Sequence, residues 1–225
     1  MNSGPPYAAI IFDCDSTLSS IEGIDELARQ AGLYEQLAPL TAAAMEGRLA
    51  LEAVYRQRLD AIRPKLESIA ALGERYIRHV VPGASETIAA LHGGGKQVHI
   101  VSGGLRQAVL PLAAYLEIPP QRVHAVDIFF DENGEYLDFD EASPLAQSGG
   151  KSVVCRQVQT QQGKVVLIGD GVTDSEVMEA GIDFIGFGGV VKRTAVQHIA
   201  PLYIDESNLL PVLDYVLPCP ASARA

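Results

Sequence analysis

The sequence is poor in cysteine and in basic residues, and each shortage argues against a class of protein. Only three of its 225 residues are cysteine (Cys14, Cys155 and Cys219), and they lie far apart without a CxxC pair. A disulfide framework is therefore not expected, and a reducing cytoplasm is the expected setting. Lys and Arg number 17 against 28 Asp and Glu, a formal net charge of −11. Because positive charge drives binding to nucleic acids and to anionic membranes, we expect neither as a partner.

Long apolar runs, repeats and low-complexity linkers are also missing. No apolar run reaches the length of a membrane span. Residues 1–6 have neither the basic region nor the hydrophobic core of a signal sequence, and residues 218–225 are expected to form a loose tail. Hydrophobic residues make up 48% of the chain and charged residues 20%. This composition predicts a sizeable core in one large domain, or in one domain that carries an insertion.

Strand and helix patterns alternate over most of the chain, which is typical of a parallel sheet covered on both faces. The apolar run at residues 7–12 predicts a first buried strand. Further strands are expected at 97–101, 123–126, 164–169, 183–187 and 202–205, a hairpin at 128–139, and helices at 85–91, 105–116, 151–160, 174–180 and 209–217. Residues 19–81 show helical patterns only. We therefore expect an α/β core of residues 1–18 and 82–225, with a helical insertion, 19–81, that can cover the strand ends.

Two carboxylates, Asp13 and Asp15, follow the first predicted strand. Ligands of open α/β sheets bind outside the carboxyl ends of the strands, so these groups would face a crevice. Two like charges at close range need a cation or a proton to coexist, and Mg²⁺ together with a phosphate would satisfy them. An Asp-rich turn followed by a Ser/Thr helix cap is the plainer alternative.

Three further segments lie where such a sheet would present them. Ser102-Gly103-Gly104 follows a predicted strand and offers a hydroxyl and free N–H groups to phosphate oxygens, although it is also an ordinary turn sequence. Gly150-Lys151-Ser152 is not a P-loop, because that motif needs glycine where Leu145 stands. Lys151 can instead offset carboxylate repulsion and hold a phosphoryl oxygen, or it can be a solvated lysine.

The third segment, residues 169–174, again places two acids after a buried strand, here beside glycines that let the backbone approach a ligand. Asp174 can cap the helix that follows, which is a frequent use of aspartate. Asp170 has no such simple explanation. The ordered set of two acids, Ser-Gly-Gly, a lysine and two further acids is much less probable by chance than any one part.

These motifs resemble the four motifs of the haloacid dehalogenase (HAD) superfamily. Within it the sequence is most similar to the phosphoserine phosphatase family, and the likeness extends from about residue 8 to 205. The resemblance implies a Rossmann-like parallel-sheet HAD core with a helical cap inserted after the first strand. It also implies a Mg²⁺-dependent phosphoric monoester hydrolase that converts O-phospho-L-serine to L-serine in serine biosynthesis, as a monomer or homodimer.

The resemblance further implies roles for the residues of the motifs. Asp13 would be the nucleophile that forms an aspartyl-phosphate, and Asp15 the proton donor and acceptor. Mg²⁺ would be held by Asp13, the main-chain carbonyl of Asp15 and Asp170, with Asp174 in support. Four residues would hold or adjoin the phosphoryl group: Ser102, Gly103, Gly104 and Lys151.

Specificity would rest on the insertion. By resemblance, Glu22 would meet the ammonium of the substrate, Arg58 its carboxylate, and Met45 would cover it, with Thr173 near the phosphate or head group. Without the resemblance, a surface ion pair and core packing would explain these residues. Leu51 and Ile21 depart from residues common in relatives and could shift the preferred substrate.

Three alternatives to a phosphoserine phosphatase remain at this point. One is another HAD phosphatase or phosphotransferase acting on a different small phosphomonoester. A signalling receiver domain also uses an acidic pocket and Mg²⁺, but the position of the acid pair and the helical insertion do not suit one. A P-loop kinase is weaker still because of Leu145.

Overall fold

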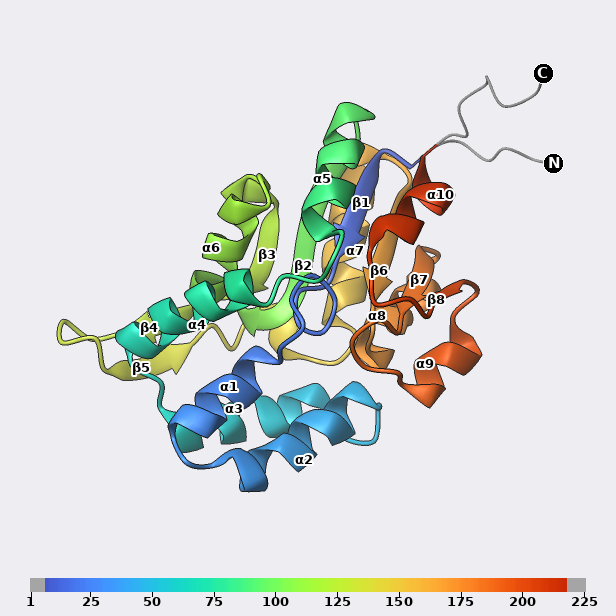
Figure 1. The fold of residues 1–225 in the computed structure, drawn as a ribbon. Coiled ribbons are helices and arrows are strands. Elements are labelled where there is room, and N and C mark those ends of the chain that lie inside the picture. Colours follow the sequence, from blue (N-terminus) through green and yellow to red (C-terminus); the bar gives the residue numbers. More distant parts are fainter. Residues whose placement is uncertain (1–6, 218–225) are drawn as a thin grey trace, which may run out of the picture.

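A computed structural model describes residues 7–217 of the chain. The terminal segments 1–6 and 218–225, for which a signal-free start and a loose tail with Cys219 are predicted, lie outside the described residues. The α/β fold class is confirmed. Its central sheet has six parallel strands in the order β3-β2-β1-β6-β7-β8 (Figure 1). Their bounds are β1 Ala9–Phe12, β2 Gln97–Leu105, β3 Val123–Val126, β6 Val165–Gly169, β7 Asp183–Phe187 and β8 Tyr203–Ile204.

The strand order places β1 in the middle of the sheet, and all four of its residues are fully buried. It pairs with β2 on one side and β6 on the other, so that Phe12 is opposite both Ile100 and Ile168. The chain adds β2 and β3 on one side of β1 before it returns to add β6, β7 and β8 on the other. This reversal of strand order at β1 creates a crevice at the carboxyl ends of β1, β2 and β6.

Helices cover both faces of the sheet, as parallel connections require. Figure 1 shows α5 and α10 on one face and α7 on the other. The helices that follow the insertion are α5 Ala84–Gly93, α6 Arg106–Tyr115, α7 Gly150–Gln162, α8 Val172–Ser175, α9 Thr194–Ile199 and α10 Leu213–Val216. Short 3₁₀ turns lie at Pro120–Arg122, Pro144–Ala146, Glu176–Ala180 and Leu210–Val212. A separate antiparallel hairpin joins β4 (Ile128–Phe130) to β5 (Tyr136–Phe139), around the predicted Asn-Gly turn.

The segment between β1 and α5 is entirely helical apart from isolated bridges. It comprises α1 Gly23–Gln30, α2 Tyr34–Met45, α3 Leu51–Ile62 and α4 Leu66–Arg78. Figure 1 shows α1, α2 and α3 grouped beyond the carboxyl end of the sheet, whereas α4 runs beside α6, against which it packs. The division into a core and a cap at residues 19–81 stays a prediction.

Two boundaries differ from the sequence prediction at functional segments. Strand β2 was expected to end at Val101, but it continues through the Ser-Gly-Gly segment to Leu105, with a break in register between Val101 and Leu105. The helix expected at residues 174–180 begins at Val172 and tightens into a 3₁₀ turn from Glu176. Glycine-rich and short segments carry weak periodicity, so pairing and packing decide their conformation. Helix α9 was not predicted.

Within the part of the chain that the structure describes, none of the helices is both long and apolar enough to cross a bilayer.

Candidate active site

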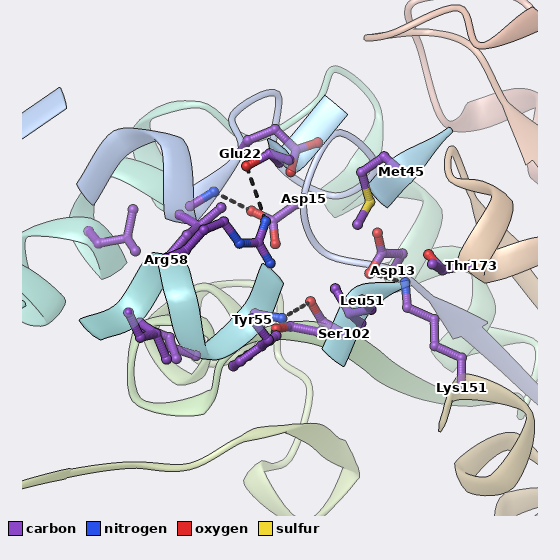
Figure 2. Close-up of a pocket in the computed structure, with 18 of the residues that line it drawn as sticks. Asp13, Asp15, Glu22, Met45, Leu51, Tyr55, Arg58, Ser102, Lys151 and Thr173 are labelled. Carbon is purple, nitrogen blue, oxygen red and sulfur yellow. Dashed lines mark hydrogen bonds and ion pairs between the residues drawn. The ribbon is translucent and has the colours of Figure 1, made fainter. Parts of the chain in front are cut away.

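Asp13 and Asp15 lie at the carboxyl end of β1 and line one pocket (Figure 2). The backbone N–H of Asp13 donates to the carbonyl of Ile168 (2.9 Å), which ties the end of β1 to β6. Asp13 faces Lys151, whereas Asp15 accepts hydrogen bonds from the Gly23 N–H (2.6 Å) and the Tyr76 hydroxyl (2.7 Å). The turn after β1 therefore gives the two acids different partners within the same pocket.

Three carboxylates gather at the junction of β1 and β6. One oxygen from each of Asp13, Asp170 and Asp174 lies within 4.8 Å of the others, and all three residues are buried. Burial and neighbouring negative charge raise the pKa of Asp170 to about 7. Burial also raises the pKa of Asp174 to about 7, although Lys151 opposes the shift. Such a group of oxygen donors, short of positive charge, suits a hard divalent cation.

Lys151 links this acidic group to the pocket. Its Nζ lies 2.8 Å from Asp13 Oδ1 and 2.5 Å from Asp174 Oδ1. Burial disfavours the lysine charge, but the two carboxylates outweigh it and hold the Lys151 pKa above its usual value. Gly150 permits this position, because a Cβ there would lie 1.7 Å from the carbonyl oxygen of Pro144. Lys151 is thus a fixed cation directly beside the predicted nucleophile.

The last position of β6 requires glycine for the same reason of close approach. A Cβ on Gly169 would lie 2.3 Å from the carboxyl carbon of Asp174, which folds back over the loop. Asp174 Oδ2 accepts the N–H of Gly171 (2.9 Å), the residue that precedes α8. Asp174 therefore caps α8 and binds Lys151 at the same time, so its capping role leaves it within the acidic group.

The Ser102–Gly104 segment forms another wall of the pocket. Ser102 is buried, and its Oγ accepts the N–H of Gly104 (3.0 Å). The carbonyl of Gly103 accepts the hydroxyl of Tyr55 (2.9 Å), a residue of α3. The segment is held between the sheet and the inserted helices, and its small residues leave room for a ligand.

The inserted helices supply the remaining walls, including Glu22, Met45 and Arg58. In Figure 2, Arg58 lies on the opposite side of the pocket from Lys151, and Met45 points toward Asp13. The Arg58 guanidinium donates to Thr41 Oγ1 (3.1 Å). Among the described residues its Nε has no hydrogen-bond partner, and no carboxylate lies within ion-pair distance. Burial lowers the Arg58 pKa below its ordinary value. A buried cation without an anion is costly, so Arg58 is suited to bind an anionic ligand.

Glu22 and Arg58 do not form the surface ion pair that was considered from the sequence. The Glu22 carboxylate instead accepts from Ser16 Oγ (2.8 Å) and lies 3.4 Å from Arg193 Nη2. Burial and the charge of Asp15 raise the Glu22 pKa to about 8. Thr173 also lines the pocket, close to the start of α8.

Four polar residues of the site were not predicted from the sequence: Thr41, Tyr55, Tyr76 and Arg193. Arg193 lies between β7 and α9, and its Nε donates to Asp170 Oδ2 (2.9 Å) while Nη2 faces Glu22. It therefore connects the acidic group with the inserted segment. The one available signal was a basic residue in the loop after a strand's carboxyl end. Thr41, Tyr55 and Tyr76 lie inside helices, and nothing in the sequence distinguishes them from other helical residues.

Comparison with known proteins agrees with this geometry. Residues 10–179 match the family model of haloacid dehalogenase-like hydrolases. The chain therefore belongs to the haloacid dehalogenase superfamily, which its sequence motifs resemble.

Relatives at higher similarity narrow the family. The chain is 40% identical over 209 residues to phosphoserine phosphatase of Bos taurus, covering 92% of this chain and 93% of that one. It is 39% identical over 200 residues to the Homo sapiens enzyme, covering 88% and 89%. A solved structure described as a phospho-aspartyl intermediate analogue of phosphoserine phosphatase superposes with a TM-score of 0.81 at 28% identity, covering 94% of this chain and all of that one. Within the superfamily, the chain is a member of the phosphoserine phosphatase family.

Arg193→Gln tests whether the link between Asp170 and Glu22 is structural. We expect it to lower the free energy of unfolding by about 3 kcal/mol, because the buried carboxylate of Asp170 and the half-buried one of Glu22 lose their cation. Urea unfolding monitored by circular dichroism measures the change. The adjacent Lys192→Gln removes only an exposed pair with Asp205 and serves as the control, with an unchanged midpoint. Equal midpoints for the two variants would contradict the assignment.

Proposed function

We propose that this protein hydrolyses O-phospho-L-serine to L-serine and inorganic phosphate through an aspartyl-phosphate on Asp13. The observation that carries the proposal is the pairing of Asp13 and Lys151 in one pocket with Arg58, a buried guanidinium whose Nε has no hydrogen-bond partner among the described residues. One end of the pocket suits a phosphoryl group beside a nucleophile, and the other suits a carboxylate. Family membership supports the same substrate.

The first half-reaction transfers the phosphoryl group to the protein. A carboxylate oxygen of Asp13 attacks phosphorus, and the bond between phosphorus and the serine oxygen breaks. Asp15 donates its proton to the departing oxygen, so that serine leaves as an alcohol. Burial and Asp13 raise the Asp15 pKa to about 7, despite the opposing bonds from Tyr76 and Gly23, which keeps a proton available near neutral pH.

The second half-reaction returns the protein to its starting state. Asp15, now a carboxylate, accepts a proton from a water molecule, whose oxygen attacks phosphorus and displaces the Asp13 carboxylate. Ser102, the Gly103 N–H and the Lys151 ammonium hold the phosphoryl oxygens throughout. Phosphate then leaves, and the Asp13 carboxylate pairs again with Lys151.

The acidic group fits Mg²⁺, which prefers oxygen ligands and few protein carboxylates. Asp13, Asp170 and the main-chain carbonyl of Asp15 would hold the ion, with Asp174 in support. When bound, it would neutralise negative charge on the phosphoryl group and the carboxylates.

The inserted segment, residues 19–81, is proposed as a cap that recognises the serine part of the substrate. Glu22 would bind the ammonium, Arg58 the carboxylate, and Met45 would exclude water, with Gly104 and Thr173 beside the phosphate or head group. Contacts with the core support this role, since a Cβ on Gly47 would lie 3.0 Å from Val172 and Tyr55 bonds to Gly103. Cys14 and Cys155 are both free thiols, which suits the proposed cytoplasmic location. The protein is proposed to act in serine biosynthesis, as a monomer or homodimer.

Asp13→Asn tests the nucleophile. We expect kcat for phosphoserine to fall by at least about 1,000-fold, because an amide cannot form the covalent intermediate. Phosphate release from the purified protein measures the rate, and Asp214→Asn, at an exposed position of α10, is the matched control with wild-type turnover. Wild-type turnover by Asp13→Asn would remove the assignment.

Arg58→Ala tests the specificity of the pocket. The KM for phosphoserine should rise by about 10- to 100-fold, because a charge-assisted bond to the substrate carboxylate is lost. The KM for phosphoethanolamine, which lacks that carboxylate, should change little. Arg56→Ala is the control, since Arg56 lies on the same helix but pairs with Asp138 and Glu141 outside the pocket. Equal losses with both substrates in Arg58→Ala would favour another phosphomonoester.

A further inference from the structure

Tyr76 contributes a polar contact to the site from an unexpected position. It lies near the end of α4, is fully buried, and its hydroxyl donates to Asp15 Oδ1 at 2.7 Å. The same oxygen accepts the backbone N–H of Gly23 at 2.6 Å. One oxygen of Asp15 therefore has two donors, which come from opposite ends of the inserted segment.

The glycine at position 23 leaves space for the Tyr76 hydroxyl beside Asp15. A Cβ on Gly23 would lie only 2.0 Å from the Tyr76 hydroxyl oxygen and 3.3 Å from Asp15 Oδ1. Any larger residue at position 23 would displace the hydroxyl from the carboxyl group. The contact thus depends on a glycine at the first position of α1, and it is not a by-product of hydrophobic packing alone.

The end of α4 is also fixed to the loop that carries Asp15. Ser19 Oγ bonds to the carbonyls of Tyr76 and His79, each at 3.1 Å. The N–H of Val81 donates to the carbonyl of Leu18 (2.9 Å). Because these bonds join the backbone around Tyr76 to the β1–α1 loop, the tyrosine keeps its position relative to Asp15 if α2 and α3 move.

The second carboxyl oxygen of Asp15 faces a different environment. Asp15 Oδ2 lies toward Gly104, where a Cβ would be 3.1 Å away, at the wall predicted to hold the substrate. With Oδ1 occupied by two donors, Oδ2 is the oxygen directed at a ligand. The carboxyl plane is therefore set by Tyr76 and Gly23 together.

We propose that Tyr76 is a positioning residue for the leaving-group step: its hydroxyl fixes Oδ1 of Asp15 so that Oδ2 meets the departing oxygen of the substrate. The inference rests on the proposed function, in which Asp15 protonates that oxygen. It adds a role for α4, which no motif of the sequence includes. A tyrosine that only filled the core would act on folding and would not distinguish one leaving group from another.

Leaving-group dependence provides the test. The kcat/KM of Tyr76→Phe is measured with phosphoserine, whose alkoxide needs a proton, and with acetyl phosphate or p-nitrophenyl phosphate, whichever the wild type turns over faster, because their leaving groups need none. We expect about a ten-fold or greater loss with phosphoserine and less than about a three-fold loss with the activated substrate. Tyr136→Phe removes another buried tyrosine hydroxyl, one without a partner among the described residues, and should behave as wild type with both.

A second variant covers the case in which Tyr76→Phe folds poorly, as thermal unfolding would reveal. Gly23→Ala keeps the tyrosine ring but displaces its hydroxyl, and it should show the same selective loss. Equal losses with both substrates, or none, in these variants would overturn the proposal for Tyr76. Asp15→Asn distinguishes failure of the Tyr76 proposal from failure of the proposed function. If Asp15→Asn lowers kcat/KM by the same factor with both substrates, Asp15 is not the proton donor, whatever the result for Tyr76→Phe.

Discussion

Electrostatic repulsion among buried carboxyl groups is the constraint on which the rest of the site depends. Within the described part of the chain, five buried or half-buried carboxyl groups gather around the carboxyl ends of β1 and β6: Asp13, Asp15, Glu22, Asp170 and Asp174. Lys151 and Arg193 form ion pairs with these acids, and a third basic side chain, Arg58, lines the same pocket without an ion pair. If all ionise, two negative charges remain, and burial makes that excess expensive. The raised pKa values of four of these acids reflect the cost. A divalent cation would remove this cost without protonation, and it would leave the Asp13 carboxylate ionised for its proposed role as nucleophile.

The parallel sheet and the inserted helices divide the work of the site. Parallel pairing at β1 aligns the strand ends, so acids that are more than 150 residues apart in the sequence share one location. The sheet and its loops provide Lys151, the acidic group and Asp13, the proposed nucleophile. The insertion provides Arg58, proposed to bind a ligand carboxylate, and Tyr76, whose hydroxyl donates to Asp15. Arg193 contacts both Asp170 and Glu22, so it joins the acidic group of the core to the inserted segment.

The sequence predicted the parts of this arrangement that depend on local pattern. Buried strands can be recognised as apolar runs in the sequence. Acids directly after two of these runs, at Asp13 and Asp170, indicated that both lie at the carboxyl edge of the sheet. The extension of β2 through Ser102–Gly104 was not predictable, because glycine carries no strand preference and pairing with β3 decides it. Arg193 and Tyr76 were missed for another reason. Each acts through a contact that spans more than 60 residues or joins separate elements, and no local spacing encodes such a contact. For Arg58 the resemblance implied a substrate carboxylate, and the structure adds that its Nε has no hydrogen-bond partner among the described residues.

Cation binding by the acidic group is the central claim, and titration calorimetry of the protein with Mg²⁺ tests it most directly. The account predicts one Mg²⁺ bound per chain, with an affinity at least about ten-fold weaker in Asp170→Asn than in wild type. It also predicts no change in Asp214→Asn, which removes the charge of an exposed residue of α10. Binding of equal strength in wild type and Asp170→Asn, or no binding by the wild-type protein, would contradict it.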